Sequence, residues 1–197
     1  MKKEQRIILN NLEVRQSEND EMILEGYAAT FDEPTVLFSI GDTEYKEVIE
    51  RGAFDEMDYK DCCLKYNHSD NVPLLARTRG GSLELSVDNK GLFFRAKLFE
   101  TQSAKDVYTL VRAGALDKCS FAFTVKDDEY DRKTNTRHIN KIDKLYDVAI
   151  VDIPAYDSTS VSARNYFEAE REKEEREKLN RAELELLLRE IKSWKKD

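Results

Sequence analysis

The chain has 197 residues, of which 37% are charged and 40% hydrophobic, a composition typical of a soluble globular protein with one domain and an appendage. The net charge of −8 lies entirely in residues 1–163, which hold 22 basic and 30 acidic side chains, so we expect no binding to nucleic acid or to an anionic membrane. No apolar run approaches the roughly twenty residues that span a bilayer, and Ile7-Ile8-Leu9 is too short for the apolar part of a signal peptide, so a cytosolic protein is expected.

The first 160 residues predict a succession of short strands separated by turns. Between residues 92 and 98, for example, Phe94, Ala96 and Leu98 share one face, while Arg95 and Lys97 share the other. Eight strands are expected on this basis: Ile7–Val14, Met22–Phe31, Glu44–Ile49, Cys62–Asn67, Leu83–Val87, Leu92–Leu98, Lys118–Lys126 and Arg137–Ile153.

Two local signals interrupt the strands. Asp88-Asn89-Lys90-Gly91 predicts a hairpin turn, with Gly91 available for a positive φ. Further along, a helix is predicted with Ser103 as its N-cap, Gly114 as a left-handed C-terminal residue, and an apolar stripe made of Val107, Leu110 and Val111. Strands in the majority with one internal helix indicate an α+β fold, a mixed-strand barrel or sandwich.

The character of the sequence changes near its end, which predicts two parts, residues 1–164 and a charged helical tail at 165–197. Residues 164–197 hold ten basic and ten acidic side chains, and residues 168–178 carry almost no apolar ones, so this stretch is either a solvated helix or a disordered linker. After it an amphipathic stripe recurs at helical spacing, formed by Leu184, Leu187, Leu188, Ile191 and Trp194. This helix either packs on its own domain or docks on another subunit or an internal scaffold.

Three cysteines, Cys62, Cys63 and Cys119, do not suit a disulfide framework, because their number is odd and two are adjacent. They also have no histidines at the spacing of a zinc site. We therefore expect reduced and largely buried thiols.

Only two histidines occur, so any histidine-dependent chemistry must use His68 or His138. A serine nucleophile needs a neighbouring base, usually an imidazole, because its hydroxyl is protonated at neutral pH. On strand periodicity His68 shares a face with Leu64 and Tyr66, and Ser120 shares a face with Ala122 and Thr124. Two strands of one sheet would in this way present the imidazole to the hydroxyl.

Six motifs in order strengthen this pairing. Together they resemble the prohead protease family of tailed bacteriophages, serine peptidases that are similar in fold to the herpesvirus assembly protease (assemblin). The resemblance covers about residues 22–164. It rests on Leu24–Pro34, Glu50–Phe54, Asn67-His68 with Pro73–Arg77, Asp88–Leu92, Ser120–Phe123, and Leu145–Ala149 leading to Pro154–Tyr156 and Thr159–Arg164.

The resemblance implies a mostly antiparallel, β-barrel-like core with a few helices, and a catalytic set of Ser120, His68 and Asp147. Asp147 stands where the family usually carries Glu. As the third member, His138 is an alternative because the herpesvirus enzymes use a second histidine, although its polar surroundings favour an exposed loop. Asp70 is too close to His68 in sequence to reach the far nitrogen of its ring.

Two further assignments stay open on the sequence alone. Cys119 is a rival nucleophile, but alternation puts it on the face opposite Ser120. For the oxyanion hole, backbone N–H groups near Ser120 or in the Arg77–Gly81 loop are candidates, as is the side chain of Arg77, which is otherwise a surface charge.

By resemblance the protein is a serine endopeptidase of the prohead, without metal or organic cofactor. The implied partners are the major capsid protein and its scaffold segment, with self-association left open and no nucleic acid or membrane. The implied location is the assembling prohead in the cytoplasm of the bacterial host, where the enzyme cleaves the scaffold or the N-terminal scaffold-like part of the capsid protein and itself. The alternative is a non-catalytic capsid assembly or scaffold protein that keeps the fold and acts through its C-terminal helix.

Overall fold

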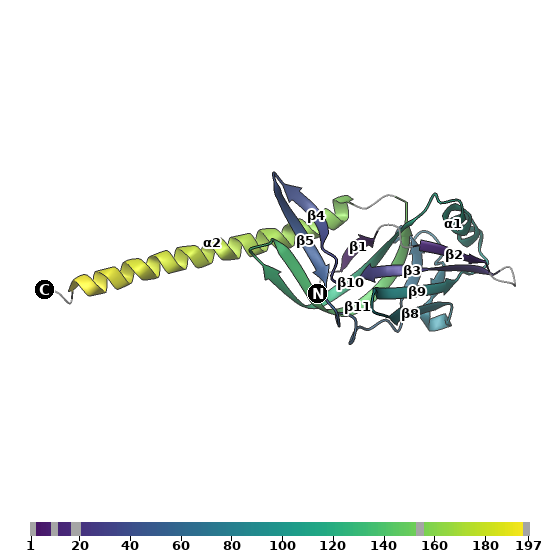
Figure 1. Ribbon diagram of the computed structural model, residues 1–197, viewed down its shortest axis with the longest axis horizontal. Helices are drawn as coiled ribbons and strands as arrows, with labels where there is room; N and C mark the ends of the chain where they lie inside the picture. Colours follow the sequence, from purple (N-terminus) through teal and green to yellow (C-terminus); the bar gives the residue numbers. More distant parts are fainter. Residues whose placement is uncertain (1–2, 9–11, 17–20, 153–155, 195–197) are drawn as a thin grey trace. The chain divides into compact units, whose positions relative to one another are not determined.

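Two β-sheets form most of the first part of the chain (Figure 1). Side chains from both sheets pack in one hydrophobic core. The structure, a computed structural model, describes residues 3–8, 12–16, 21–152 and 156–194. It divides into two units, Met1–Thr159 and Ser160–Asp197. The larger sheet has the order β1 (Glu4–Ile8), β10 (Lys118–Asp131), β11 (Thr136–Val151), β5 (Thr43–Ile49) and β4 (Thr35–Ile40), and β6 (Cys63–Tyr66) with β7 (Ala76–Arg77) also joins it through β11. The smaller sheet has the order β2 (Leu12–Gln16), β3 (Met22–Thr30), β9 (Gly91–Lys97) and β8 (Leu83–Val87).

The α+β class and the predominance of strands are confirmed, but the barrel-like closure is wrong. Both sheets are open in the part of the chain that the structure describes. Most strand pairs are antiparallel, and the exceptions are β5 and β6, which both run parallel to β11. The long strand β11 therefore pairs with β5 near its N-terminal end and with β6 near its C-terminal end. This arrangement brings two distant segments of sequence against the same strand.

The predicted strands are mostly present, with three differences. The strand expected at Ile7–Val14 is wrong, because β1 and β2 belong to different sheets, with residues 9–11 outside the described ranges. Strands β4 and β7 are not among the predicted strands. Strands β10 and β11 are longer than expected at their shared hairpin, although Ile153 lies outside the described residues. The faces predicted for residues 94–98 are confirmed, since Phe94, Ala96 and Leu98 are buried whereas Arg95 and Lys97 are exposed.

Gly91 is required at the β8–β9 hairpin for a reason other than the predicted positive φ. The residues with positive φ do not include it. A Cβ atom at this position would lie 1.9 Å from the carbonyl oxygen of Ala29 on β3, where the pairing of β3 with β9 shifts register. Asp88 closes the turn by accepting hydrogen bonds from the backbone N–H groups of Lys90 and Gly91 at 2.7 and 3.0 Å. Glycine is therefore needed because the two strands approach closely.

The internal helix α1 (Gln102–Arg112) begins earlier than predicted. Its N-cap is Thr101, not Ser103, and the Thr101 hydroxyl accepts a hydrogen bond from the Ala104 N–H at 3.2 Å. Val107 and Val111 are buried as expected, whereas Leu110 is 42% exposed. Gly114 has a φ of 72°, which confirms the predicted left-handed residue at the helix end.

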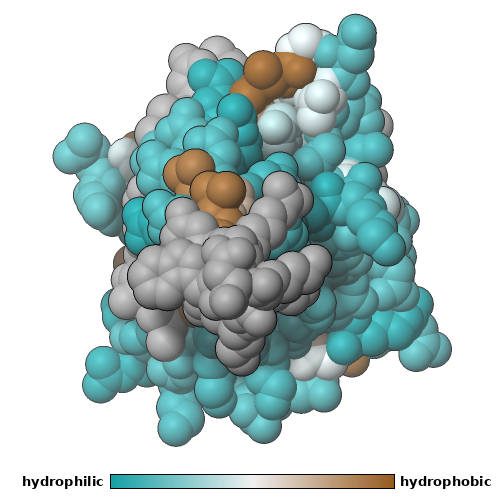
Figure 2. Space-filling model, turned by 90° about the vertical axis from the view of Figure 1, so that its left-hand side faces the viewer, coloured by the Kyte–Doolittle hydropathy of each residue, from teal (hydrophilic) through white to brown (hydrophobic). Residues whose placement is uncertain are grey.

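The second unit is dominated by one long helix, α2 (Tyr156–Trp194). Residues 168–178 are helical, so the linker alternative for this stretch is wrong. Within the predicted stripe, Leu184, Leu187 and Leu188 are each about half exposed, whereas the side chains of Ile191 and Trp194 lie outside the described ones. Hydrophilic residues predominate on the molecular face drawn in Figure 2, where hydrophobic ones form small separate patches. Among the described helices, none is both long and apolar enough to cross a membrane.

Candidate active site

Ser120 lies on β10 with its side chain on the face of the larger sheet that points away from the shared core. Its neighbour Cys119 belongs to the core, so alternation places Ser120 and Ala122 on the other face. In the register of β10 with β11, Ser120 is opposite Ala149 and Ala122 is opposite Asp147. On this face, Ala122 on the same strand and Ala149 on β11 are small, buried neighbours of the hydroxyl.

His68 lies in a turn and not at the end of a strand. Strand β6 ends at Tyr66, and Asn67 and His68 both have a φ of 52°. A hydrogen bond of 3.0 Å from the Ser69 N–H to the Tyr66 carbonyl closes the turn. Two central residues with positive φ are what a type I′ turn requires.

This turn decides which face the imidazole reaches. Leu64 and Tyr66 pack on the shared core, so an uninterrupted strand would have turned His68 toward the core, away from Ser120. The turn instead brings His68 Nε2 to 2.6 Å from Ser120 Oγ. The two side chains meet, but the strand-face argument that paired them is wrong.

Asp147 completes a line of contacts from the hydroxyl. Its Oδ1 is hydrogen-bonded to His68 Nδ1, and its Oδ2 accepts a hydrogen bond from Lys3 Nζ at 2.9 Å. The residue is 1% exposed. Burial raises the pKa of Asp147, but the hydrogen bonds and charges of His68 and Lys3 together lower it by more. The pKa of Asp147 therefore lies below its ordinary value. An ionised carboxylate accepts a hydrogen bond from Nδ1–H of the imidazole. The proton of the neutral ring is then on Nδ1, so Nε2 can accept the proton of Ser120.

The alternative third members lie elsewhere. His138 is on β11 and not in an exposed loop, so that expectation is wrong; its Nδ1 lies 2.6 Å from Glu50 Oε1. On the same strand, Ala149 is the residue opposite Ser120, and His138 precedes Ala149 by eleven residues, roughly 36 Å along an extended strand at about 3.3 Å per residue. The carboxylate of Asp70 is exposed and pairs with Lys65.

The cysteines are reduced, as expected, and two of the three are buried. Cys119 packs in the shared core, and burial raises the pKa of its thiol to about 12. Burial also raises the pKa values of the Cys62 and Cys63 thiols. A thiol needs a lowered pKa to act as a nucleophile near neutral pH, so the environment of Cys119 argues against the rival nucleophile.

The expected donors of an oxyanion hole do not stand beside the hydroxyl. Arg77 is on β7, which β6 and β11 separate from β10, and its guanidinium binds Asp61 Oδ1 and Oδ2 at 2.6 and 2.7 Å. The short helix η1 (Thr78–Gly80) follows it directly. Strand β10 lies between β1 and β11 at Ser120, so its backbone N–H groups there point toward partner strands. Arg77 thus forms an ion pair with Asp61 at the surface and does not supply a donor to the hydroxyl.

A buried ionic cluster, which the sequence analysis missed, joins four strands of the larger sheet. We define it as Glu4, Arg6, Glu47, Asp128 and Arg137. Arg6 donates to both carboxylate oxygens of Glu47 at 2.5 and 2.6 Å, and Arg137 donates to Glu4 at 2.8 Å and to Asp128 at 2.7 Å. The members are far apart in sequence, so no local pattern predicts the cluster.

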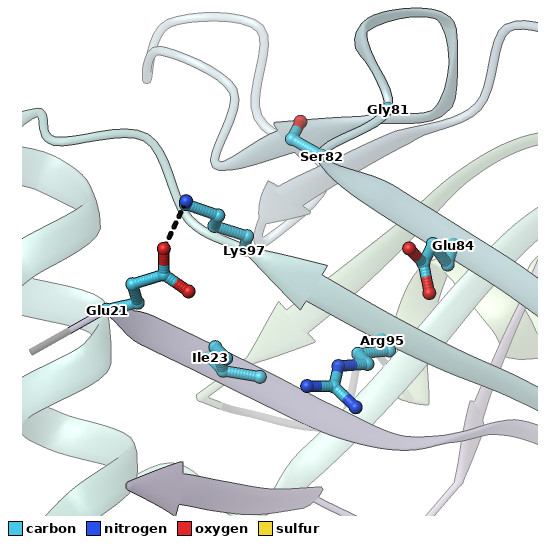
Figure 3. A pocket seen from close by; sticks show the side chains of 7 residues that line it. All are labelled: Glu21, Ile23, Gly81, Ser82, Glu84, Arg95 and Lys97. Atoms are coloured by element: carbon cyan, nitrogen blue, oxygen red, sulfur yellow. Dashed lines mark hydrogen bonds and ion pairs between the residues drawn. The ribbon is translucent and has the colours of Figure 1, made fainter. Parts of the chain in front are cut away.

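A polar pocket of about 390 Å³ lies on the smaller sheet, away from Ser120 (Figure 3). Its lining side chains come from three neighbouring segments, and Glu21 forms an ion pair with Lys97 across it. None of Ser120, His68 and Asp147 lines it. Among the described residues, no group of three or more His, Cys, Asp or Glu side chains is arranged to hold a metal ion.

Comparison with known proteins identifies the family to which the chain belongs. The model of the caudovirus prohead serine protease family matches residues 10–174, and the chain belongs to this family. Among solved structures, the chain is similar to the bacteriophage T4 capsid assembly protease, gp21, with 13% sequence identity and a TM-score of 0.48 over 77% of this chain and 99% of that one. A comparison with curated proteins gave no match.

Proposed function

We propose that this chain is an active serine endopeptidase that matures the phage prohead, with Ser120 as nucleophile, His68 as general base and Asp147 as the third member of the triad. The observation that carries the proposal is the continuous line of contacts Ser120 Oγ–His68 Nε2–Asp147. Membership of a family of serine proteases supports the reaction class.

The proposed reaction begins when Ser120 Oγ attacks the carbonyl carbon of the scissile peptide bond. His68 Nε2 takes the hydroxyl proton during this attack and then gives it to the leaving amine. The C–N bond breaks and leaves an ester between the substrate and Ser120. Water, deprotonated by the same nitrogen, hydrolyses the ester and regenerates the hydroxyl. The small side chains of Ala122 and Ala149 leave room beside the reacting atom.

The role proposed for Asp147 is electrostatic. Its ionised carboxylate fixes the tautomer of His68 and stabilises the imidazolium that forms when the proton moves. The lowered pKa keeps the carboxylate ionised at neutral pH. Asp is shorter than the Glu usual in the family, and the direct contact between Asp147 and His68 supports this role for the shorter side chain.

The substrates proposed are the scaffold, or the N-terminal scaffold-like part of the major capsid protein, and the protease itself, inside the assembling prohead. Co-expression with the neighbouring capsid gene product, followed by mass spectrometry of the N-terminus of that product, tests the proposal. We expect a new N-terminus with the wild-type chain and none with Ser120→Ala or His68→Ala. Processing by the Ser120→Ala chain at the wild-type rate would exclude the catalytic assignment.

The tail offers a second function, because several large apolar side chains of α2 are exposed, among them Leu179 (66%) and Leu186 (59%). We propose that residues 165–197 form a docking helix for an internal scaffold, separate from the protease domain at 1–164. A chain ending near Tyr166 should keep its Ser120 chemistry but lose co-sedimentation with proheads. A non-catalytic scaffold protein would instead need only the tail, and its wild-type chain would not shorten on storage faster than Ser120→Ala.

A further inference from the structure

Among the described residues, Lys3 and His68 are the two whose side chains hydrogen-bond to the Asp147 carboxylate. We propose that Lys3 is a positioning residue of the active site, which holds Asp147 ionised and oriented toward His68. This inference rests on the proposed function, since it assigns a role within the triad.

The position of Lys3 follows from the pairing of β1 with the strand that carries the nucleophile. Gln5 lies opposite Ala122, and Ala122 in turn lies opposite Asp147. Paired residues share a face of the sheet, and so do residues two apart on a strand. Lys3, two residues before Gln5, therefore lies on the same face of the sheet as Ser120 and Asp147. Its ammonium group also lies 5.2 Å from the centre of the Tyr146 ring.

The opposite face of β1 fixes this register. Glu4 and Arg6 alternate with Lys3 and Gln5, and both belong to the buried ionic cluster. A slip by one residue would turn these two charges out of the cluster and Lys3 away from Asp147. Because unpaired buried charges are costly, the cluster holds β1, and with it Lys3, in one register.

The consequence is electrostatic. The Lys3 side chain is 43% exposed and that of Asp147 is 2% exposed, so the pair lies at the edge of the buried site. Several other described titratable groups interact electrostatically with Asp147. They are His68 and Asp70 near the turn, Cys63 and Lys65 on β6, and Cys62 just before β6. The Lys3 cation favours the ionised carboxylate and opposes a second positive charge on the nearby imidazole. Without it, the site should accept a further positive charge more readily.

The experiment compares full-length wild type, Lys3→Met, Lys3→Arg and Lys144→Met. Lys144 is the matched control, because its side chain is similarly exposed (40%) and lies 5.3 Å from the same Tyr146 ring, but its carboxylate partner is Asp58 and not Asp147. A fluorophosphonate probe forms a phosphorus–oxygen bond with an activated serine and releases fluoride. The rate of Ser120 labelling is measured by mass spectrometry between pH 5 and pH 9, beside thermal melting of each variant.

We expect Lys3→Met to move the acidic limb of the labelling profile to higher pH by about 0.5 to 1 unit, with Lys3→Arg and Lys144→Met unchanged. A merely structural role would lower the melting temperature without moving the limb. The inference is overturned if the limb of Lys3→Met coincides with that of Lys144→Met while wild type is labelled at Ser120. If wild type is not labelled at Ser120 at any pH, the proposed function itself fails, and the role of Lys3 fails with it.

Discussion

The side-chain Oδ1 of Asn67 accepts a hydrogen bond from the backbone N–H of Asp152 at 3.2 Å, which ties the turn that carries His68 to the chain just after β11. The Asn67 N–H also donates to the Ile150 carbonyl at 2.9 Å. Strand β11 supplies Asp147 as well, so the same strand holds both partners of the His68–Asp147 contact. Asn67 thereby couples the position of the imidazole to that of its carboxylate.

Substitution of Asn67 should lower turnover in a graded way. Asn67→Ala removes the Oδ1 contact and also puts alanine, which tolerates positive φ poorly, at a position where φ is 52°. Asn67→Gly removes only the contact. We expect kcat to decrease in the order wild type, Gly, Ala, with a stability loss of about 1 kcal/mol for Gly and about 2–3 kcal/mol for Ala. Peptide cleavage and thermal melting measure both effects. Equal kcat for Ala and wild type would show that the turn does not depend on this side chain.

Asp147→Asn should leave a folded protein with strongly reduced turnover. An amide favours the wrong tautomer of the base, and the corresponding change in a well-studied triad costs about ten-thousand-fold in kcat. His138→Ala should cost far less, because His138 binds Glu50 at the other end of β11. The two variants are compared by peptide cleavage at neutral pH. A reversed order of the two effects would make His138 the third member.

Cys119→Ala should keep turnover within a few-fold of wild type, because the thiol packs in the core on the far side of the sheet from His68. With iodoacetamide at pH 8, Cys63 should react before Cys62 and Cys119, since Cys63 alone is only partly buried. Peptide mapping by mass spectrometry gives the order of alkylation. Loss of cleavage in Cys119→Ala, with Ser120→Ala still active, would restore the cysteine hydrolase alternative.

Arg137→Met should destabilise the protein strongly. It leaves Glu4, Glu47 and Asp128 with less positive charge in a buried cluster, and breaking a buried ion pair typically costs about 3–5 kcal/mol. The control is Arg77→Met, which breaks the exposed bidentate pair with Asp61 and should cost about 0–1 kcal/mol. Denaturant unfolding gives both free energies. Equal losses for the two variants would mean that the cluster adds nothing beyond a surface pair.

Gly91→Ala should also destabilise, because its methyl group would meet the Ala29 carbonyl oxygen at 1.9 Å and force β3 and β9 apart. Forced overpacking of this kind costs about 1–3 kcal/mol or more. Gly80→Ala is the matched control, since no atom lies within 4 Å of its added Cβ. Thermal melting compares the two variants. A melting temperature of Gly91→Ala equal to that of Gly80→Ala would show that the strands adjust without cost.

The sequence by itself determined the strands with regular alternation, the helix end at Gly114, and the segments that could supply a nucleophile and a base. These features depend on neighbours in the chain, because burial on one face imposes a period of two on a strand and a left-handed residue favours glycine. With only two histidines and the motifs around Ser120 and Asp147, the sequence also indicated the family to which the chain belongs.

Only the tertiary structure decided on which side of the sheet the imidazole lies, and that Lys3 and the buried ionic cluster accompany the site. Alternation placed His68 with Leu64 and Tyr66, yet these two face the core, and the turn at Asn67 and His68 reverses the outcome. Asn and His are both enriched among non-glycine residues with positive φ, a weak local signal that strand alternation does not take into account. Contacts such as Lys3–Asp147, 144 residues apart, arise from the pairing of β1, β10 and β11, and the pattern within any one strand does not specify its neighbours in a sheet.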